Sequence, residues 1–244
     1  MGKNRDNEQL DAIQELIDRA LIDEVLGVVK SGKEATVYCC ADGDRLLAAK
    51  VYRSRNVRGF HNDADYRVGK MRGARARESR AVANRSRLGR TLAFASWVGD
   101  EYNALSMLHR AGADVPEPVA QSSTVILMEY LGDEDEPARM LSDVRPSPDE
   151  ARTLFERLMR NIELMLTCDR VHGDLSPFNV LYYRGDVRII DFPQAVDARF
   201  NQNALPLLER DIDRLCAYFR RFGVESDPWR LAHGLWSRFL RSEL

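Results

Sequence analysis

A polar loop followed by a short β-hairpin constrains the fold of this chain more than any other segment. Two apolar runs, 180–183 and 187–190, flank a two-residue Arg-Gly pair, which is typical of antiparallel strands joined by a tight turn. Asn179 immediately precedes the first run and Asp191 immediately follows the second. The hairpin is therefore expected to bring these two polar side chains to the same end.

The loop before the hairpin adds a carboxylate with a defined spacing. Asp174 stands five residues before Asn179 in the run His-Gly-Asp-Leu-Ser-Pro-Phe-Asn. Taken singly, an Asp or Asn in a loop is more often a turn or cap residue. Together with Asp191, the three match a phosphoryl-transfer site, in which the first Asp accepts a proton and the other two residues hold metal ions.

The N-terminal part of the chain offers partners for the phosphates of a nucleotide. Kinase phosphate loops follow Gly-x-Gly-x-x-Gly-x-Val, and here only Gly32 of the three glycines is present, in register with Val37. Lys50 follows thirteen residues after Val37, at the place of the phosphate-binding strand lysine. Glu101, in the next predicted helix, is expected to pair with Lys50 and fix its ammonium group.

Apolar periodicity and turn residues predict an α+β protein. The predicted strands lie on either side of a glycine-containing turn within 27–38, at 46–52 and at 124–131, besides the hairpin. The predicted helices span 8–26, 97–110, 148–168, 205–222 and 227–242. Ser147, with Pro148 and Glu150 after it, has the pattern of a helix capping box.

The stretch 53–90 differs from its surroundings because it is rich in Arg, Gly, Ser and Asn and poor in large apolar residues. Such a composition predicts a mobile loop with some helix. Its basic excess fits either a solvated face or an arm that binds a polyanion. If the stretch is such an arm, residues 58–90 are expected to become ordered when they bind RNA or an acidic partner.

Bulk composition excludes several classes. The formal net charge of −2 gives no global field that would favour nucleic acid or a membrane surface. No apolar run approaches the roughly 20 residues needed to cross a bilayer, and no signal peptide is recognisable. The four cysteines fit neither a zinc site nor a disulfide framework, which favours a reducing, cytoplasmic location.

Two longer motifs carry a family resemblance. Residues 31–38, Ser-Gly-Lys-Glu-Ala-Thr-Val-Tyr, and residues 172–182, His-Gly-Asp-Leu-Ser-Pro-Phe-Asn-Val-Leu-Tyr, resemble the two signatures of the RIO kinases, which are atypical serine/threonine protein kinases. The resemblance runs from about Ile17 to Phe219 and favours the first RIO subfamily or a compact prokaryotic relative. The sequence Phe192-Pro193-Gln194 departs from the first subfamily, because it is the sequence expected of the second.

The resemblance implies a two-lobed, protein-kinase-like fold. Residues 1–127 would form an N-lobe with an antiparallel sheet and a helix, and residues 128–244 a hinge and a mainly helical C-lobe. Lys50, Glu101 and Asp174 would be catalytic, and Asn179 and Asp191 would bind Mg²⁺ or Mn²⁺. The implied ATP contacts are Ser31, Gly32, Lys33, Glu34, Val37, Ala48, Lys50, Met128, Glu129, Leu131, Ser176, Asn179 and Asp191.

By the same resemblance, the protein would bind ATP and transfer its γ-phosphoryl group to a protein serine or threonine, to itself or to water. The implied partner is the small ribosomal subunit or its RNA, contacted through residues 58–90, by a monomer or weak dimer. Two alternatives stay open: a small-molecule phosphotransferase of the aminoglycoside or choline kinase type, and a ribosome-assembly binding factor that uses ATP as a switch.

The interval after Asp191 bears on the acceptor. Nineteen residues separate Asp191 from Asp211, which is expected to head the next helix. A conventional protein kinase places an activation segment and further helices there to dock a peptide. The sequence therefore predicts slow ATP hydrolysis, self-phosphorylation and poor phosphorylation of generic peptides.

Overall fold

A computed structural model describes residues 3–53, 87–133 and 136–244 of the chain. They form two compact units, the first within the bounds Met1–Asn103 and Glu117–Leu131, and the second within Ala104–Pro116 and Gly132–Leu244. The sequence placed the boundary after residue 127, whereas the strand β5 (Val125–Glu129) continues past that point. Residues 104–116 group with the second unit, where Asp114 bonds to Arg157.

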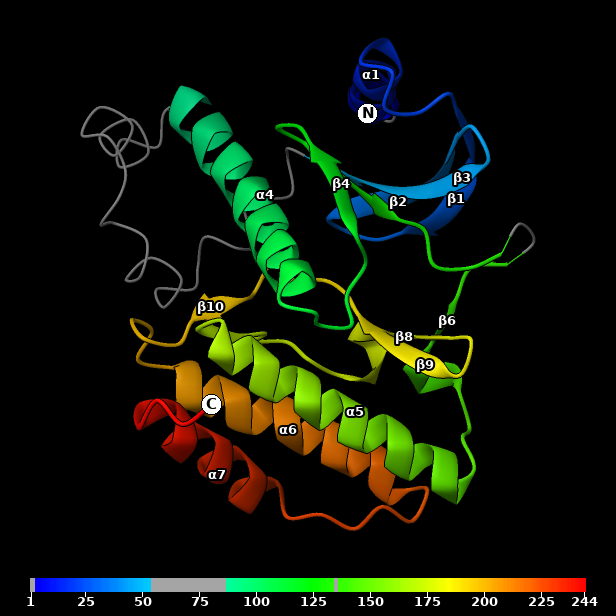
Figure 1. Cartoon of the computed structure of the whole chain (residues 1–244). Coiled ribbons are helices and arrows are strands. Elements are labelled where there is room, and N and C mark those ends of the chain that lie inside the picture. The colour runs from blue at the N-terminus through cyan, green and yellow to red at the C-terminus, as the bar shows by residue number, and fades with distance from the viewer. Residues whose placement is uncertain (1–2, 54–86, 134–135) are drawn as a thin grey trace. The chain divides into compact units, whose positions relative to one another are not determined.

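Unit 1 contains a five-stranded antiparallel sheet in the order β1-β2-β3-β5-β4, seen in Figure 1 beside α1 and α4. β1, β2, β3 and β5 match the predicted runs within four residues at each predicted end. The strand bounds are β1 Glu24–Ser31, β2 Ala35–Asp42, β3 Arg45–Tyr52, β4 Pro118–Gln121 and β5 Val125–Glu129. Residues 32–34 form the predicted glycine-containing turn between β1 and β2.

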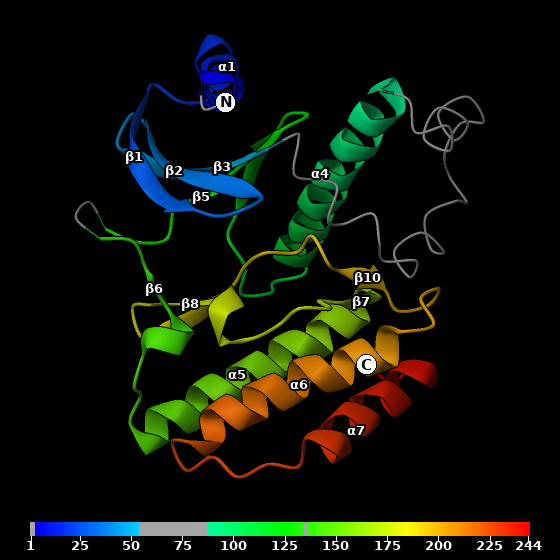
Figure 2. The same cartoon turned by 180° about the vertical axis from the view of Figure 1, so that it is seen from behind.

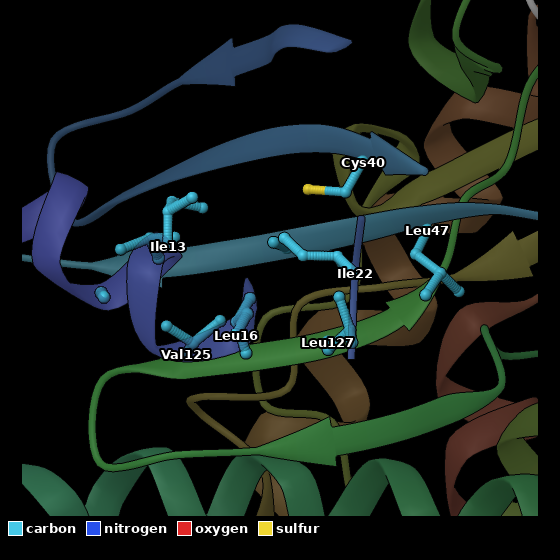
Figure 3. Packing of buried hydrophobic residues seen from close by; sticks show 10 residues of the cluster. Ile13, Leu16, Ile22, Cys40, Leu47, Val125 and Leu127 are labelled. Carbon is cyan, nitrogen blue, oxygen red and sulfur yellow. The ribbon is translucent and has the colours of Figure 1, made fainter. Parts of the chain in front are cut away.

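The helix α1 (Lys3–Asp18) packs one apolar face on this sheet. Its Ile13 and Leu16 lie among Leu47, Val125 and Leu127 from the strands, as Figure 3 shows. Burial of such side chains contributes roughly 1.5–3 kcal/mol each, and it fixes the sheet that carries Lys50.

The prediction of a helix over 8–26 was wrong at both ends. The helix closes at Asp18 because Leu21 N–H bonds to Leu16 O and Ala20 N–H to Ile17 O, the pattern of a Schellman motif. Ala20 takes the left-handed conformation, with φ of 50°, that glycine usually supplies there. The apolar residues after it then enter β1.

The helix α4 (Arg87–Arg110) begins ten residues before its predicted start at Trp97. Trp97, Leu105 and Leu108 are buried as predicted. The earlier start agrees with an apolar face that extends back to Phe94, whose ring lies 6.4 Å from Tyr52 and 6.1 Å from Trp97. The proline-containing run 115–118 follows the helix, and its last residue begins β4.

Unit 2 is mainly helical. The helices α5 (Pro148–Thr167), α6 (Ala204–Arg220) and α7 (Pro228–Leu240) lie side by side in both Figure 1 and Figure 2. The predicted capping box is confirmed, because Glu150 N–H bonds to Ser147 Oγ and the Glu150 carboxylate accepts from Ser147 N–H. The prediction that Asp211 heads a helix was wrong, since α6 begins at Ala204.

Short strands and single-turn helices complete unit 2. They are β6 Arg139–Met140, β7 Arg170–Val171, β8 Val180–Tyr183, β9 Asp186–Ile189 and β10 Val196–Asp197, with 3-10 turns at Leu141–Asp143 and Pro177–Asn179. β8 and β9 form the predicted hairpin, with Val180 opposite Ile189. Arg184 and Gly185 both have positive φ, as a two-residue type I′ turn requires.

The structure thus confirms the predicted α+β class, with an antiparallel sheet and helix in one unit and mostly helices in the other. The predicted basic loop lies almost wholly outside the described residues. Within the described ranges, none of the helices combines the length and apolarity that crossing a bilayer demands.

Candidate active site

Lys50 and Glu101 form an ion pair in unit 1. Lys50 Nζ, from β3, lies 2.7 Å from Glu101 Oε1 on α4. Only 12% of the lysine side chain and 5% of the glutamate side chain are exposed. A charge-assisted hydrogen bond with so little exposure to solvent holds the ammonium group in one place, because breaking it would leave a buried charge uncompensated.

Tyr52 completes this arrangement, although the sequence analysis did not select it. The Tyr52 hydroxyl donates to Glu101 Oε2, so both carboxylate oxygens have partners. Burial, followed by the nearby Glu101 charge, raises the pKa of Tyr52 well above its usual value, which keeps the hydroxyl protonated. The Tyr52 ring packs edge-on against Trp97 at 4.8 Å and lies 5.1 Å from Lys50 Nζ.

The signal for Tyr52 was present in β3. Successive side chains of a strand point to opposite faces, so Tyr52 shares a face with Lys50 two residues earlier. A buried hydroxyl on that face needs a partner. Glu101 was the carboxylate already expected there.

The predicted phosphate loop connects β1 and β2. Gly32 N–H bonds to Ala35 O at 2.9 Å across the turn. Arg53, directly after β3, fastens both sides: Arg53 Nη2 donates to Ser31 Oγ at 2.8 Å and to Thr36 Oγ1 at 2.9 Å. Its own N–H donates to Glu34 O at 2.8 Å. The loop that carries Lys33 is therefore tied to the strand that carries Lys50.

Several of the predicted ATP contacts lie on or just beyond neighbouring strands of the same sheet. Val37 on β2 stands opposite Lys50, and Ala48 on β3 stands opposite Met128 on β5. Glu129 is the last residue of β5, and Leu131 follows just beyond it. The Glu129 N–H already donates to Glu117 O at 2.8 Å, so only its carbonyl could serve a base.

In unit 2, the predicted catalytic loop is held by His172 and Gly173. Burial lowers the pKa of His172, so its ring is neutral, and Nε2 lies 3.1 Å from Ile190 O, which requires it to donate. Nδ1 then accepts the Asp174 N–H at 3.3 Å. Gly173 has φ of 77°, and a Cβ there would lie 2.6 Å from Gln194 O, so no other residue fits without a shift.

Asn179 and Asp191 meet at one end of the hairpin, as predicted, because Ile190 N–H donates to Asn179 O at 3.0 Å. Asn179 Nδ2 donates to Asp174 O at 2.8 Å and approaches Asp174 Oδ2 at 3.3 Å, which leaves Asn179 Oδ1 as its acceptor. Asp191 adopts φ of 73°, a strained value that recurs at functional sites. Ser176 precedes the 3-10 turn, and its carbonyl accepts the Asn179 N–H.

This donor set fits Mg²⁺ better than a transition metal. Among the residues that the structure describes, no group of three or more His, Cys, Asp and Glu side chains is placed to hold a metal alone. Mg²⁺ is commonly bound by one or two protein oxygens, with phosphates and water completing the shell. Asn179 and Asp191 match that requirement.

The helix α6 grips the catalytic loop through residues that the sequence analysis did not place in the site. Asp211, 2% exposed, accepts Gly173 N–H at 2.8 Å and Leu175 N–H at 3.0 Å. Arg210 donates to Gly173 O. Burial raises the pKa of Asp211 to about 7, against the lowering effect of these backbone hydrogen bonds and of the neighbouring arginines.

A sequence signal for Asp211 existed. It stands three residues after Leu208 and four before Leu215, so a carboxylate lies on the apolar face of an amphipathic helix. A buried carboxylate needs several hydrogen-bond donors. The loop that supplies them is 36 to 38 residues earlier in the chain, which single-sequence periodicity does not reveal.

A polar cluster supports the strand that leads to Asp191. Asp114 accepts from Arg157 Nε and Nη2 at 2.8 and 2.7 Å and from Asn161 Nδ2 at 2.7 Å. Burial alone would raise the pKa of Asp114, but these hydrogen bonds together lower it. Its carbonyl accepts Ile189 N–H at 2.8 Å, which ties β9 to the cluster.

Comparisons with known proteins agree with this geometry. Residues 36–230 match the RIO domain model. The chain is 33% identical to the RIO-type serine/threonine-protein kinase Rio1 of Haloferax volcanii, over 91% of this chain and 72% of that protein. It is 32% identical to the human serine/threonine-protein kinase RIO1, over 86% of this chain but only 35% of the human protein.

The fold has a solved counterpart. The crystal structure of the Rio2 kinase-ADP/Mg²⁺-phosphoaspartate complex from Chaetomium thermophilum matches with a TM-score of 0.64 and 23% identity, over 95% of this chain and 69% of that one. The structural match extends the sequence match to the whole fold. By its RIO domain and its similarity to Rio1 proteins along most of its length, this chain belongs to the RIO-type family of atypical serine/threonine protein kinases.

Proposed function

We propose that this protein binds Mg-ATP and transfers the γ-phosphoryl group to a protein hydroxyl, to itself or to water. The observation that carries the proposal is the placement of Asp174, Asn179 and Asp191 around one hairpin end. Asn179 donates to Asp174 through its side chain, and its carbonyl accepts the N–H of Ile190, the residue before Asp191. The buried Lys50–Glu101 pair supports it, because that lysine would hold the α- and β-phosphates.

The roles of the residues follow from their chemistry. Asp174 would accept the proton of the attacking hydroxyl. Asn179 Oδ1 and the Asp191 carboxylate would hold Mg²⁺, which would offset the negative charge of the phosphates. Residues 31–34 would cover the phosphates. Met128, the Glu129 carbonyl and Leu131 would receive the base, with Val37 and Ala48 beside it.

The short connection between Asp191 and α6 supports the proposed acceptor. Helix α6 begins at Ala204, so twelve residues, fewer than expected, separate it from Asp191. So short a segment favours weak recognition of free peptides, since an acceptor that is not held in line gains little rate. The Rio2 structure is that of a phosphoaspartate complex. We propose that Asp191 accepts a phosphoryl group here in the same way.

The small ribosomal subunit, or its RNA, is the proposed partner. This proposal rests on the family resemblance and on the basic stretch 58–90. That stretch falls almost wholly outside the described residues. A ribosome-assembly factor that uses ATP as a switch would share the same nucleotide site and the same partner.

Radiolabelled ATP tests these proposals directly. The purified protein would be assayed alone, with a peptide library, with small alcohols and with small-subunit particles. We expect slow turnover alone, stimulation by particles, and a protein-bound label that hydroxylamine removes, as it does from acyl phosphates. Efficient, sequence-selective labelling of free peptides, or turnover driven by small alcohols, would contradict the proposed acceptor.

Asp191→Ala provides the metal control for the same assays. Because Asp191 supplies the only carboxylate of the proposed metal pair, the variant should lose the Mg²⁺ dependence of ATP binding and also the hydroxylamine-sensitive label. Titrations of ATP with and without Mg²⁺ measure the first effect. An unchanged metal dependence would remove Asp191 from the metal site.

A further inference from the structure

Arg214 forms an ion pair with the proposed proton acceptor. Arg214 Nη1, on α6, lies 2.8 Å from Asp174 Oδ1. We propose that Arg214 is a positioning residue that fixes the Asp174 carboxylate for proton transfer. The proposal rests on the proposed function, because it assigns Arg214 a part in that same phosphoryl transfer.

The two hydrogen bonds to the Asp174 carboxylate orient it and leave some of its acceptor positions open. Arg214 occupies Oδ1, while Asn179 Nδ2 approaches Oδ2 at 3.3 Å. An ionised carboxylate has about four acceptor positions, so two hydrogen bonds leave room for an acceptor hydroxyl. With one donor on each oxygen, rotation of the carboxylate about its bond to Cβ would break both contacts.

The backbone of Arg214 is held in place. It lies three residues after Asp211 and four after Arg210, so these three side chains share one side of α6. Asp211 takes two backbone N–H groups of the loop, and Arg210 takes the Gly173 carbonyl. Leu215, next to Arg214, is fully buried. Arg214 therefore reaches Asp174 from a helix that is already locked to the loop.

Exposure indicates that this pair matters for rate more than for stability. The side chains of Arg214 and Asp174 are 38% and 48% exposed. Ion pairs this exposed contribute little to folding, because water screens them and long side chains lose entropy. Misplacing a reacting group by about 1 Å, in contrast, can lower a rate by roughly 100-fold.

The assisted step is a simple exchange of bonds. As the acceptor oxygen forms its bond to the γ-phosphorus, the bond from that phosphorus to the β,γ-bridging oxygen breaks, and its electron pair leaves with ADP. The acceptor O–H proton passes to a carboxylate oxygen of Asp174. Arg214 transfers nothing in this step; it holds the carboxylate in one orientation.

A double-mutant cycle tests the proposal. Arg214→Ala should lower kcat for ATP turnover by roughly 10-fold to 100-fold while changing ATP affinity by less than about 2-fold. Arg214→Lys, which keeps the charge and a donor, should recover most of that loss. In an Asp174→Asn background, Arg214→Ala should have no further effect on rate. Arg220→Ala, at an exposed position of the same helix, is the matched control and should match wild type.

Unfolding measurements on the same four proteins of the cycle separate an effect on rate from an effect on folding. Arg214→Ala should move the unfolding midpoint by less than about 3 °C. Additive effects of the two substitutions on kcat, or a lysine variant as slow as the alanine variant, would overturn the positioning role.

A wild-type protein that binds ATP without turning it over would refute the proposed function and the positioning role with it.

Discussion

The two units hold their candidate catalytic groups in different ways. In unit 1, Glu101 is 5% exposed and both of its oxygens are taken by buried partners, Lys50 and Tyr52. In unit 2, Asp174 is 48% exposed, and its loop is held mainly through backbone atoms by α6. The Glu101 carboxylate is part of the core of unit 1, whereas the Asp174 carboxylate lies on a loop that α6 holds through hydrogen bonds.

This contrast suggests a division of labour. A group that must only hold phosphates can be buried with its partner, since it never exchanges a proton. A group that must receive an acceptor and a proton has to stay accessible, so the fold fixes the loop and leaves the carboxylate open. Substitutions in unit 1 should therefore affect stability and binding together, whereas those around Asp174 should affect rate.

Asp174→Asn should give the largest effect and the cleanest separation. The amide keeps the shape of the side chain but cannot accept the proton as a base, so turnover should fall by roughly 10²–10⁴-fold. ATP affinity should stay near wild type, and so should the unfolding midpoint. Calorimetry with ATP and a single-turnover assay measure these quantities; wild-type turnover in the variant would exclude Asp174 as the base.

Lys50→Met should lower both stability and ATP binding. It leaves the buried Glu101 carboxylate without its cation, which costs roughly 3 kcal/mol of unfolding free energy, and it removes a phosphate contact. Arg45→Met is the matched control, because Arg45 and Glu117 also form a close pair, 2.6 Å apart, but are 46% and 49% exposed. That variant should lose less than about 1 kcal/mol.

Denaturant unfolding of both variants provides the comparison. Equal losses for the two would mean that burial does not govern the energetics of the Lys50 pair, and the contrast between the units would lose its basis.

Tyr52→Phe should have a smaller effect of the same kind. The ring keeps its packing on Trp97, but Glu101 Oε2 loses its donor in a buried place. The expected cost is about 1–2 kcal/mol of unfolding free energy, with a higher KM for ATP and little change in kcat. A fall in kcat at unchanged KM would place Tyr52 in the chemical step instead.

Sequence reasoning succeeded where the determinants are local. The hairpin, its Arg184-Gly185 turn and the cap at Ser147 follow from neighbouring residues, and Asn179 and Asp191 follow from the hairpin. It failed at the end of α1, where Ala20 takes a conformation that favours glycine, and at the start of α4, where Phe94 packs on a distant strand.

The site residues that were missed share one property. Asp211, Arg214 and Tyr52 act on groups that lie 36 or more residues away in the chain. Periodicity shows which face of a helix or strand they occupy, but not what lies opposite that face. Their partners became identifiable only when the elements were placed together in each unit.

The pH dependence of stability tests how α6 holds the catalytic loop. The pKa of Asp211 is raised to about 7 in the folded protein, mainly by burial, and would be near 3.8 when unfolded. Between these values the folded state binds more protons, so this group's contribution to stability is full below about pH 4 and is lost as the pH rises through about 7. Asp211→Asn removes the titration while keeping the shape.

The unfolding midpoint of wild type minus that of Asp211→Asn should therefore decrease from pH 5 to pH 8. His172 works in the opposite direction, because its lowered pKa costs stability as the pH falls below about 6.5. Since His172 is present in both proteins, the subtraction removes its contribution. A difference in midpoint that stays constant across this range would show that Asp211 remains ionised throughout, held by the two backbone N–H groups more strongly than burial opposes it.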